Sequence, residues 1–200
     1  MTFESLRITG RNGQRYELGT PMHVHDGNVH LGTVDPVRVS RDGTEVHIER
    51  FLPSQFVKEQ KRNFGPLVLL EVTAYLAEQF HGVQTISYSL SREIEMHGDG
   101  MKVASARSAL LQDIGAEGVT ITPRPDHETP GNFVVEGVWA YNERNVAALG
   151  YCLTREREIY RQWEAPASQP AAIPALRDRL RQLLARGAGE AGARDGDGAD

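Results

Sequence analysis

The sequence predicts an α/β (α+β) protein with a mixed, mostly antiparallel sheet and flanking helices, followed by a C-terminal helical extension. Two observations predict this class. Apolar and polar residues alternate between residues 6 and 53, which is typical of half-buried strands. After residue 53 the apolar residues recur at helical spacing, and helical and strand-like segments then follow one another.

The first strands are expected between residues 6 and 53, joined by tight turns. Asn-Gly and Asp-Gly pairs favour hairpin turns, and they occur in residues 11–13, 25–28 and 41–44. Pro36 is expected to bend or end one of these strands. A later strand alternates Val46, Ile48 and Leu52 with His47, Glu49 and Phe51. The pattern indicates an antiparallel meander.

The remaining elements follow in order along the chain. A buried helix is expected over residues 68–80, ended by Gly82, and a strand over residues 83–91. A second helix runs over residues 100–114 and closes at Gly115, and two strands follow at 119–122 and 132–141. Asn142 can cap a third helix. Its apolar stripe consists of Val146, Leu149, Leu153, Tyr160 and Trp163.

The length of 200 residues favours one domain with appendages. We expect a single domain over residues 1–163 and a linker rich in proline and alanine over residues 164–172. Residues 173–186 are expected to form a short amphipathic helix with leucines on one side. The acidic tail, residues 187–200, is too poor in apolar groups to become ordered.

Composition excludes several classes of protein. With 40% hydrophobic residues, the chain has no run near the roughly 20 apolar residues of a membrane span. The N-terminus lacks the features of a cleavable signal. A single cysteine, Cys152, cannot pair within the chain, which favours a cytoplasmic protein, although an exported effector would have the same composition. The net charge of −5, of which −3 lies in the tail, gives no basis for nucleic-acid binding.

The segment over residues 60–67 is the most suggestive for function. It carries Lys61 and Arg62, then Gly65, and lies between a strand and a long helix. Pro66 suits the first helical position. Free N–H groups at a helix start, together with cations, form an anion site suited to a phosphate. The alternative is an ordinary basic loop before a core helix.

The order of elements resembles the GNAT acyltransferases over residues 46–141. A strand ending in proline, the turn with Arg62 and Gly65, an amphipathic helix, a strand, a second helix ending in Ile114-Gly115-Ala116 and a strand pair follow one another as in that family. Leu67 stands where the family has Gly or Ala, and Leu111 where its general-acid tyrosine commonly lies. Residues 109–116 resemble the family's corresponding motif.

The resemblance implies an acyl-CoA-dependent N-acyltransferase with acetyl-CoA, or another acyl-CoA, as co-substrate and no metal. The acceptor would be an amine on a small molecule or a protein. The residues that would hold the coenzyme are Leu52, Lys61, Arg62, Asn63, Phe64, Gly65 and Leu67. Leu52 would offer its backbone N–H to the thioester carbonyl, and Glu49 would be the general base. A solvent-facing glutamate is the alternative for Glu49.

Other candidate sites have simpler interpretations. His23, His25 and His30 could hold a metal, but scattered surface histidines are the commoner outcome, and we expect no metal site. Cys152 is expected to be a buried, inert thiol. The polar loop over residues 123–131 could form the rim of a binding site.

A function of another class stays open at this point. The chain could be a non-catalytic binding or adaptor protein on a degenerate GNAT-like scaffold, which acts through its C-terminal helices. A homodimer or a partner protein would then be bound through residues 143–163 or 173–186.

Overall fold

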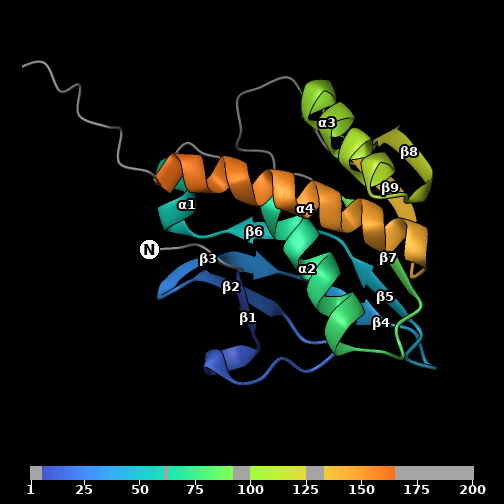
Figure 1. The fold of residues 1–200 in the computed structure, drawn as a ribbon, viewed down its shortest axis with the longest axis horizontal. Helices are drawn as coiled ribbons and strands as arrows, with labels where there is room; N and C mark the ends of the chain where they lie inside the picture. The colour runs from blue at the N-terminus through green and yellow to red at the C-terminus, as the bar shows by residue number, and fades with distance from the viewer. Residues whose placement is uncertain (1–5, 61–62, 92–99, 125–132, 165–200) are drawn as a thin grey trace, which may run out of the picture. The chain divides into compact units, whose positions relative to one another are not determined.

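The computed structural model describes residues 6–60, 63–91, 100–124 and 133–164 (Figure 1). The chain divides into two compact units, Met1–Arg161 and Gln162–Asp200. The sheets belong to the first unit. Apart from Glu164, the predicted linker, the amphipathic helix at 173–186 and the acidic tail lie outside the described residues.

One sheet has four strands, all antiparallel, in the order β1-β2-β3-β6. The strands are β1 (Arg7–Thr9), β2 (Met22–Asp26), β3 (Val29–Val34) and β6 (Phe51–Pro53). The predicted hairpin at residues 11–13 is wrong, because these residues form a 3-10 turn, η1 (Arg11–Gly13), and β2 begins only at Met22. Positive φ angles at Asn12 and Gly13 tighten this turn locally.

A second sheet has five strands in the order β4-β5-β7-β9-β8. They are β4 (Val37–Val39), β5 (Glu45–Ile48), β7 (Thr85–Leu90), β9 (Phe133–Ala140) and β8 (Glu117–Pro123). The pair β5–β7 is parallel and the other pairs are antiparallel. The predicted mixed, mostly antiparallel α+β class is thus confirmed, although the strands form two sheets rather than one.

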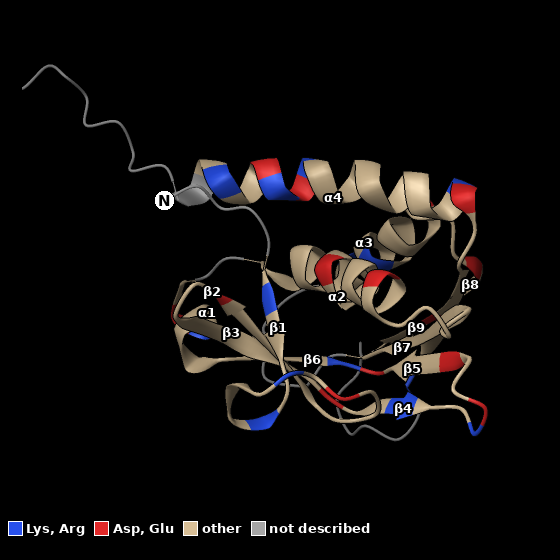
Figure 2. Cartoon of the chain, turned by 60° about the horizontal axis from the view of Figure 1, so that its bottom comes forward, with Lys and Arg blue, Asp and Glu red and all other residues tan. Residues whose placement is uncertain are grey.

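The helices are α1 (Gln55–Gln60), α2 (Gly65–Gln79), α3 (Gly100–Asp113) and α4 (Glu143–Glu164). The short α1 was not predicted. Asn142 caps α4 as expected, because its Oδ1 accepts the N–H of Asn145 at 2.9 Å. Gly115, with a φ of 84°, ends α3. Figure 2 shows α2, α3 and α4 on the same side of the five-stranded sheet.

The two faces of the five-stranded sheet therefore differ. The face toward the helices is buried and apolar, with Val46, Ile48, Ile86, Tyr88, Leu90, Val135 and Trp139. Within this core the hydroxyls of Tyr88 and Thr73 lie 2.8 Å apart, and Trp139 donates its Nε1–H to the carbonyl of Ile114. The opposite face, which no helix of the described residues covers, carries polar side chains such as Glu45, Ser89 and Glu136.

Helix α4 belongs to the first unit up to Arg161 and contributes to its core. Leu149, Leu153 and Tyr160 of the predicted stripe are buried. Val146 is 40% exposed, contrary to the prediction. At about 100° per residue, it lies roughly 70° from the middle of the arc that α4 buries.

An ion pair fixes α4 on α2. The guanidinium of Arg157 donates to both carboxylate oxygens of Glu71, at 2.8 and 2.9 Å. The Glu71 side chain is only 5% exposed, whereas that of Arg157 is 27% exposed. Near the same end of α4, Tyr160 donates its O–H to Asp26 Oδ2 at 2.6 Å. The pair therefore holds a helix that also touches the four-stranded sheet.

We expect Arg157→Leu to destabilise the protein, because it leaves the Glu71 carboxylate buried without a cation. Removal of one partner of a buried pair costs about 3–5 kcal/mol, and we expect a loss near the lower end because Arg157 is partly exposed. Urea unfolding followed by circular dichroism measures this loss. Arg155→Leu is the control, because Arg155 is more exposed and its ion pairs are long, at 3.8 Å. We expect its free energy of unfolding to change by no more than about 0.5 kcal/mol. Equal losses in the two variants would contradict this account of α4.

Candidate active site

The candidate site is the place where a parallel strand pair separates. Strands β5 and β7 run side by side from the pair Glu45–Thr85 to the pair Ile48–Tyr88. Beyond it, the N–H of Ser91 reaches the carbonyl of Glu49 at 3.4 Å. The chain then enters β6, which pairs with β3 in the other sheet (Figure 1). β6 is an edge strand of the four-stranded sheet, so the edge that faces away from β3 has no strand partner among the described residues.

Hydrogen bonds determine which backbone groups of β6 face that unpaired edge. Arg50 accepts from Asp35 N–H, and Ser54 donates to the carbonyl of Leu31. Backbone groups alternate between the two sides of a strand, so Leu52, directly opposite Thr33, also points toward β3. The N–H and carbonyl of Phe51 point the other way. The N–H at the separation of the strands is therefore that of Phe51, whereas Leu52 was predicted for this role.

Gly32 is required where β3 approaches β6. A Cβ at this position would collide with the carbonyl oxygen of Leu52 and lie 2.5 Å from the ring of Phe51. The close approach independently places the Leu52 carbonyl on the β3 side. The absence of a side chain at Gly32 thus lets β6 leave β7 and join the four-stranded sheet.

The start of α2 has fewer unbonded backbone N–H groups than the sequence suggests. Gly65 donates its N–H to Asn63 Oδ1 at 3.3 Å, and Pro66 has no N–H. The N–H of Leu67 has no acceptor among the described residues. Phe64 and Leu67 are each only 3% exposed as whole residues, so both present little surface to a ligand. Lys61 and Arg62 lie outside the described residues.

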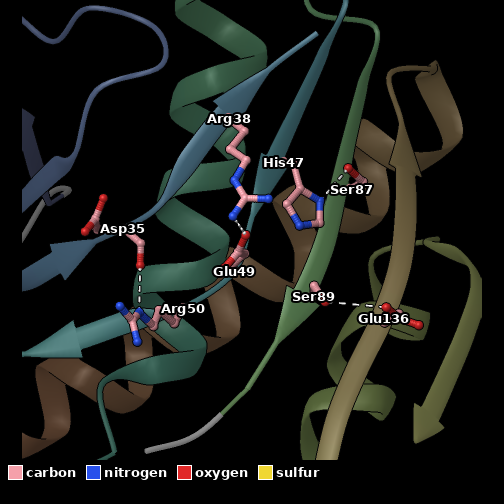
Figure 3. Close-up of polar contacts among 8 residues, drawn as sticks. All are labelled: Asp35, Arg38, His47, Glu49, Arg50, Ser87, Ser89 and Glu136. Carbon is pink, nitrogen blue, oxygen red and sulfur yellow. Dashed lines mark hydrogen bonds and ion pairs between the residues drawn. The ribbon is translucent and has the colours of Figure 1, made fainter.

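Glu49 lies in the two-residue break between β5 and β6 rather than within a strand. Its side chain is on the polar face, and Figure 3 shows it directed at Arg38. Glu49 Oε1 and Arg38 Nη2 are 2.7 Å apart, with side chains 28% and 68% exposed. The predicted base is thus already paired with a cation from β4.

A series of polar contacts that the sequence did not predict lies near Glu49, and Figure 3 shows the one between His47 and Ser87. Ser87 donates its hydroxyl to Glu45 Oε1 at 2.7 Å, and Ser87 Oγ lies 3.0 Å from His47 Nδ1. The alternation of Glu45 and His47 with buried neighbours placed them on one face. Nothing in the sequence indicated the parallel pairing of β5 with β7, which brings Ser87 between them.

The three predicted histidines gather on one face of the four-stranded sheet. The ring of His30 lies 5.6 Å from that of His23 and 5.0 Å from that of His25. Within the described ranges, no group of three or more His, Cys, Asp or Glu side chains is arranged to hold a metal ion. Burial, and then the neighbouring His30, Arg7 and His23, lower the pKa of His25.

Two further features lie away from the candidate site. Cys152 is buried as predicted, and burial raises the pKa of its thiol, so it is a poor nucleophile. A hollow lined by Ala77, His81, Val83 and Tyr141 lies at the C-terminal end of α2, opposite to the end that begins at Gly65. The predicted rim over residues 123–131 is described only up to Arg124.

Comparison with known proteins finds no matching family model and no matching curated protein. Several solved structures are similar in part. A proposed acetyltransferase from T. thermophilus is 13% identical with a TM-score of 0.41, over 68% of this chain and 65% of that one. Diaminobutyrate acetyltransferase EctA from Paenibacillus lautus is 15% identical with a TM-score of 0.40, over 66% and 76%.

A protein of unknown function from Aquifex aeolicus VF5, AQ1966, is similar over 92% of both chains, with 13% identity and a TM-score of 0.40. Acetyltransferases are thus among the solved structures similar to this chain. In the part of the chain that the structure describes, no helix is both long and apolar enough to span a bilayer.

We expect acidification to destabilise the fold partly through His25. Because its pKa is lower in the folded protein than the ordinary value of about 6.5, the unfolded chain binds the proton more readily as the pH falls below that value. The free energy of unfolding therefore decreases as the pH falls from 8 to 5.5. Urea unfolding should show a smaller decrease in His25→Gln. His81→Gln, in the turn before β7, should keep the wild-type decrease, and an unchanged decrease in His25→Gln would contradict the assignment.

Proposed function

We propose that this protein is an acyl-CoA-dependent N-acyltransferase acting on an amine. The observation that carries the proposal is the separation of β5–β6 from β7, with the N–H of Phe51 on the unpaired edge. This is the place at which the family resemblance of the sequence puts the thioester. A strand edge whose N–H has no partner among the described residues suits a carbonyl oxygen that gains negative charge during acyl transfer.

In the proposed reaction, the nitrogen of the neutral amine attacks the thioester carbonyl carbon. The C–N bond forms, the C–S bond breaks, and the thiolate of the coenzyme leaves and takes up a proton. Phe51 N–H donates to the carbonyl oxygen while charge develops on it. Holding the two substrates side by side supplies much of the rate, because their encounter no longer limits the reaction.

The diphosphate of the coenzyme would bind at the start of α2. The predicted cations Lys61 and Arg62, and then Asn63, precede this helix in the sequence, and the N–H of Leu67 belongs to its first turn. A helix N-terminus favours an anion through its dipole. Because the Gly65 N–H is held by Asn63, the cations carry more of this binding than the backbone does.

The amine acceptor would approach from the polar face of the five-stranded sheet. No helix of the described residues covers this face, whereas α2 and α3 fill the other side. The acceptor must also lose a proton there. Glu49 remains a predicted proton acceptor, although its pairing with Arg38 competes with that role.

Binding of acetyl-CoA tests the proposal directly. At 100 times its dissociation constant, a ligand that binds only the folded protein stabilises it by about 2.7 kcal/mol. We expect acetyl-CoA to raise the melting temperature, and Arg62→Ala to weaken binding about tenfold, the order expected for one charge-assisted hydrogen bond. Isothermal titration calorimetry measures the two dissociation constants.

Arg41→Ala provides the matched control, because Arg41 is an exposed arginine in the turn between β4 and β5. It should bind acetyl-CoA like the wild type. A wild-type protein whose melting temperature does not change at millimolar acetyl-CoA would refute the proposed function.

A further inference from the structure

The contacts of Glu45, Ser87 and His47 on the polar face have no part in the reaction as described so far. Glu45 and His47 come from β5, and Ser87 comes from the facing position of β7, directly opposite His47. Ser87 is 9% exposed and Glu45 is exposed. Ser87 Oγ lies 2.7 Å from Glu45 Oε1 and 3.0 Å from His47 Nδ1.

These contacts determine where the imidazole carries its proton. A serine hydroxyl has one hydrogen, and an ionised carboxylate can only accept. Ser87 therefore donates to Glu45 and must accept from His47, so the proton of the neutral ring lies on Nδ1. His47 Nε2 is then the basic nitrogen, and it has no hydrogen-bond partner among the described residues.

We propose that His47 Nε2 is the proton acceptor of the reaction, an inference that rests on the proposed acyl transfer. An alkylamine is an ammonium ion at neutral pH and cannot attack until it loses a proton. His47 takes that proton and releases it to solvent after the acyl group is transferred. The second proton, lost when the C–N bond forms, goes to the departing thiolate.

Three charged groups lie around His47. Glu45 on its own strand and Glu49 beyond the strand end are both on the polar face. The guanidinium of Arg38, directly opposite His47 on β4, is engaged with Glu49 at 2.7 Å. An imidazole changes charge near neutral pH, which suits a proton acceptor better than an ordinary carboxylate.

The position of His47 sets the route of the proton. His47 is four residues before Phe51, roughly 13 Å along an extended chain. The proton of an ammonium ion beside Phe51 would therefore pass to Nε2 along a series of bound waters rather than by direct contact. Glu49 lies between the two on the polar face, where its pair with Arg38 borders this route.

The experiment measures acetyl-CoA-dependent acetylation of a panel of primary amines, including lysine, spermidine and glucosamine, by release of the free thiol. With the amine that the wild type accepts, we expect His47→Gln to lower kcat roughly 10²- to 10⁴-fold at pH 7. Its affinity for acetyl-CoA should not change. The loss should shrink toward pH 9.5, because the amine then loses its proton in solution.

Companion variants separate the base from its neighbours. Ser87→Ala should lower kcat less than His47→Gln and shift the pH profile, as expected of a positioning residue. Glu49→Gln should lower kcat by less than about tenfold. His81→Gln, at the far end of α2, should match the wild type. Nitrogen-15 NMR of the imidazole should find the proton of neutral His47 on Nδ1 in the wild type and partly on Nε2 in Ser87→Ala.

The outcomes distinguish the two proposals. A wild type that acetylates no amine in the panel and does not bind acetyl-CoA overturns the proposed function, and the proton acceptor with it. A wild type that acetylates while His47→Gln has the same kcat at pH 7 overturns only the assignment of His47. So does a wild-type ring whose neutral form carries its proton on Nε2.

Discussion

The segment Glu45–Pro53 belongs to both sheets, and a strand edge can pair with only one neighbour at a time. Up to Ile48 the segment pairs with β7, and from Phe51 it pairs with β3. Gly32 permits the second pairing, because any side chain there would meet the backbone of β6. The exchange of partners leaves the edge of β6 that faces away from β3 without a strand partner among the described residues. An unpaired strand edge binds other backbone-like groups readily.

Packing of the helices decides which face of the five-stranded sheet is buried. Helices α2 and α3 pack on the apolar face of the five-stranded sheet, and α4 lies on the same side. The pair Glu71–Arg157 and the hydrogen bond from Tyr160 to Asp26 hold α4 there. The polar face consequently stays uncovered by helices within the described residues, and the titratable side chains beside the strand separation can meet solvent and ligand.

The polar contacts on that face depend on how the strands pair rather than on any one residue. His47 alone is an ordinary half-buried histidine, and Ser87 alone is a small residue on a strand. The parallel register places Ser87 between Glu45 and His47, which turns three common side chains into a directed series of hydrogen bonds. The antiparallel pairing of β4 with β5 places Arg38 near Glu49 and gives the predicted base a partner.

The sequence by itself determined the local elements: the turns at residues 25–28 and 41–44, the cap at Asn142, the stop at Gly115 and the periods of α2, α3, β7 and β9. Each depends on residues within a few positions of one another. It did not determine that one predicted strand divides between two sheets, that Phe51 rather than Leu52 faces the separation, or that Ser87 meets His47. Those features depend on contacts between residues up to about 40 positions apart, and only the tertiary structure brings such residues into register.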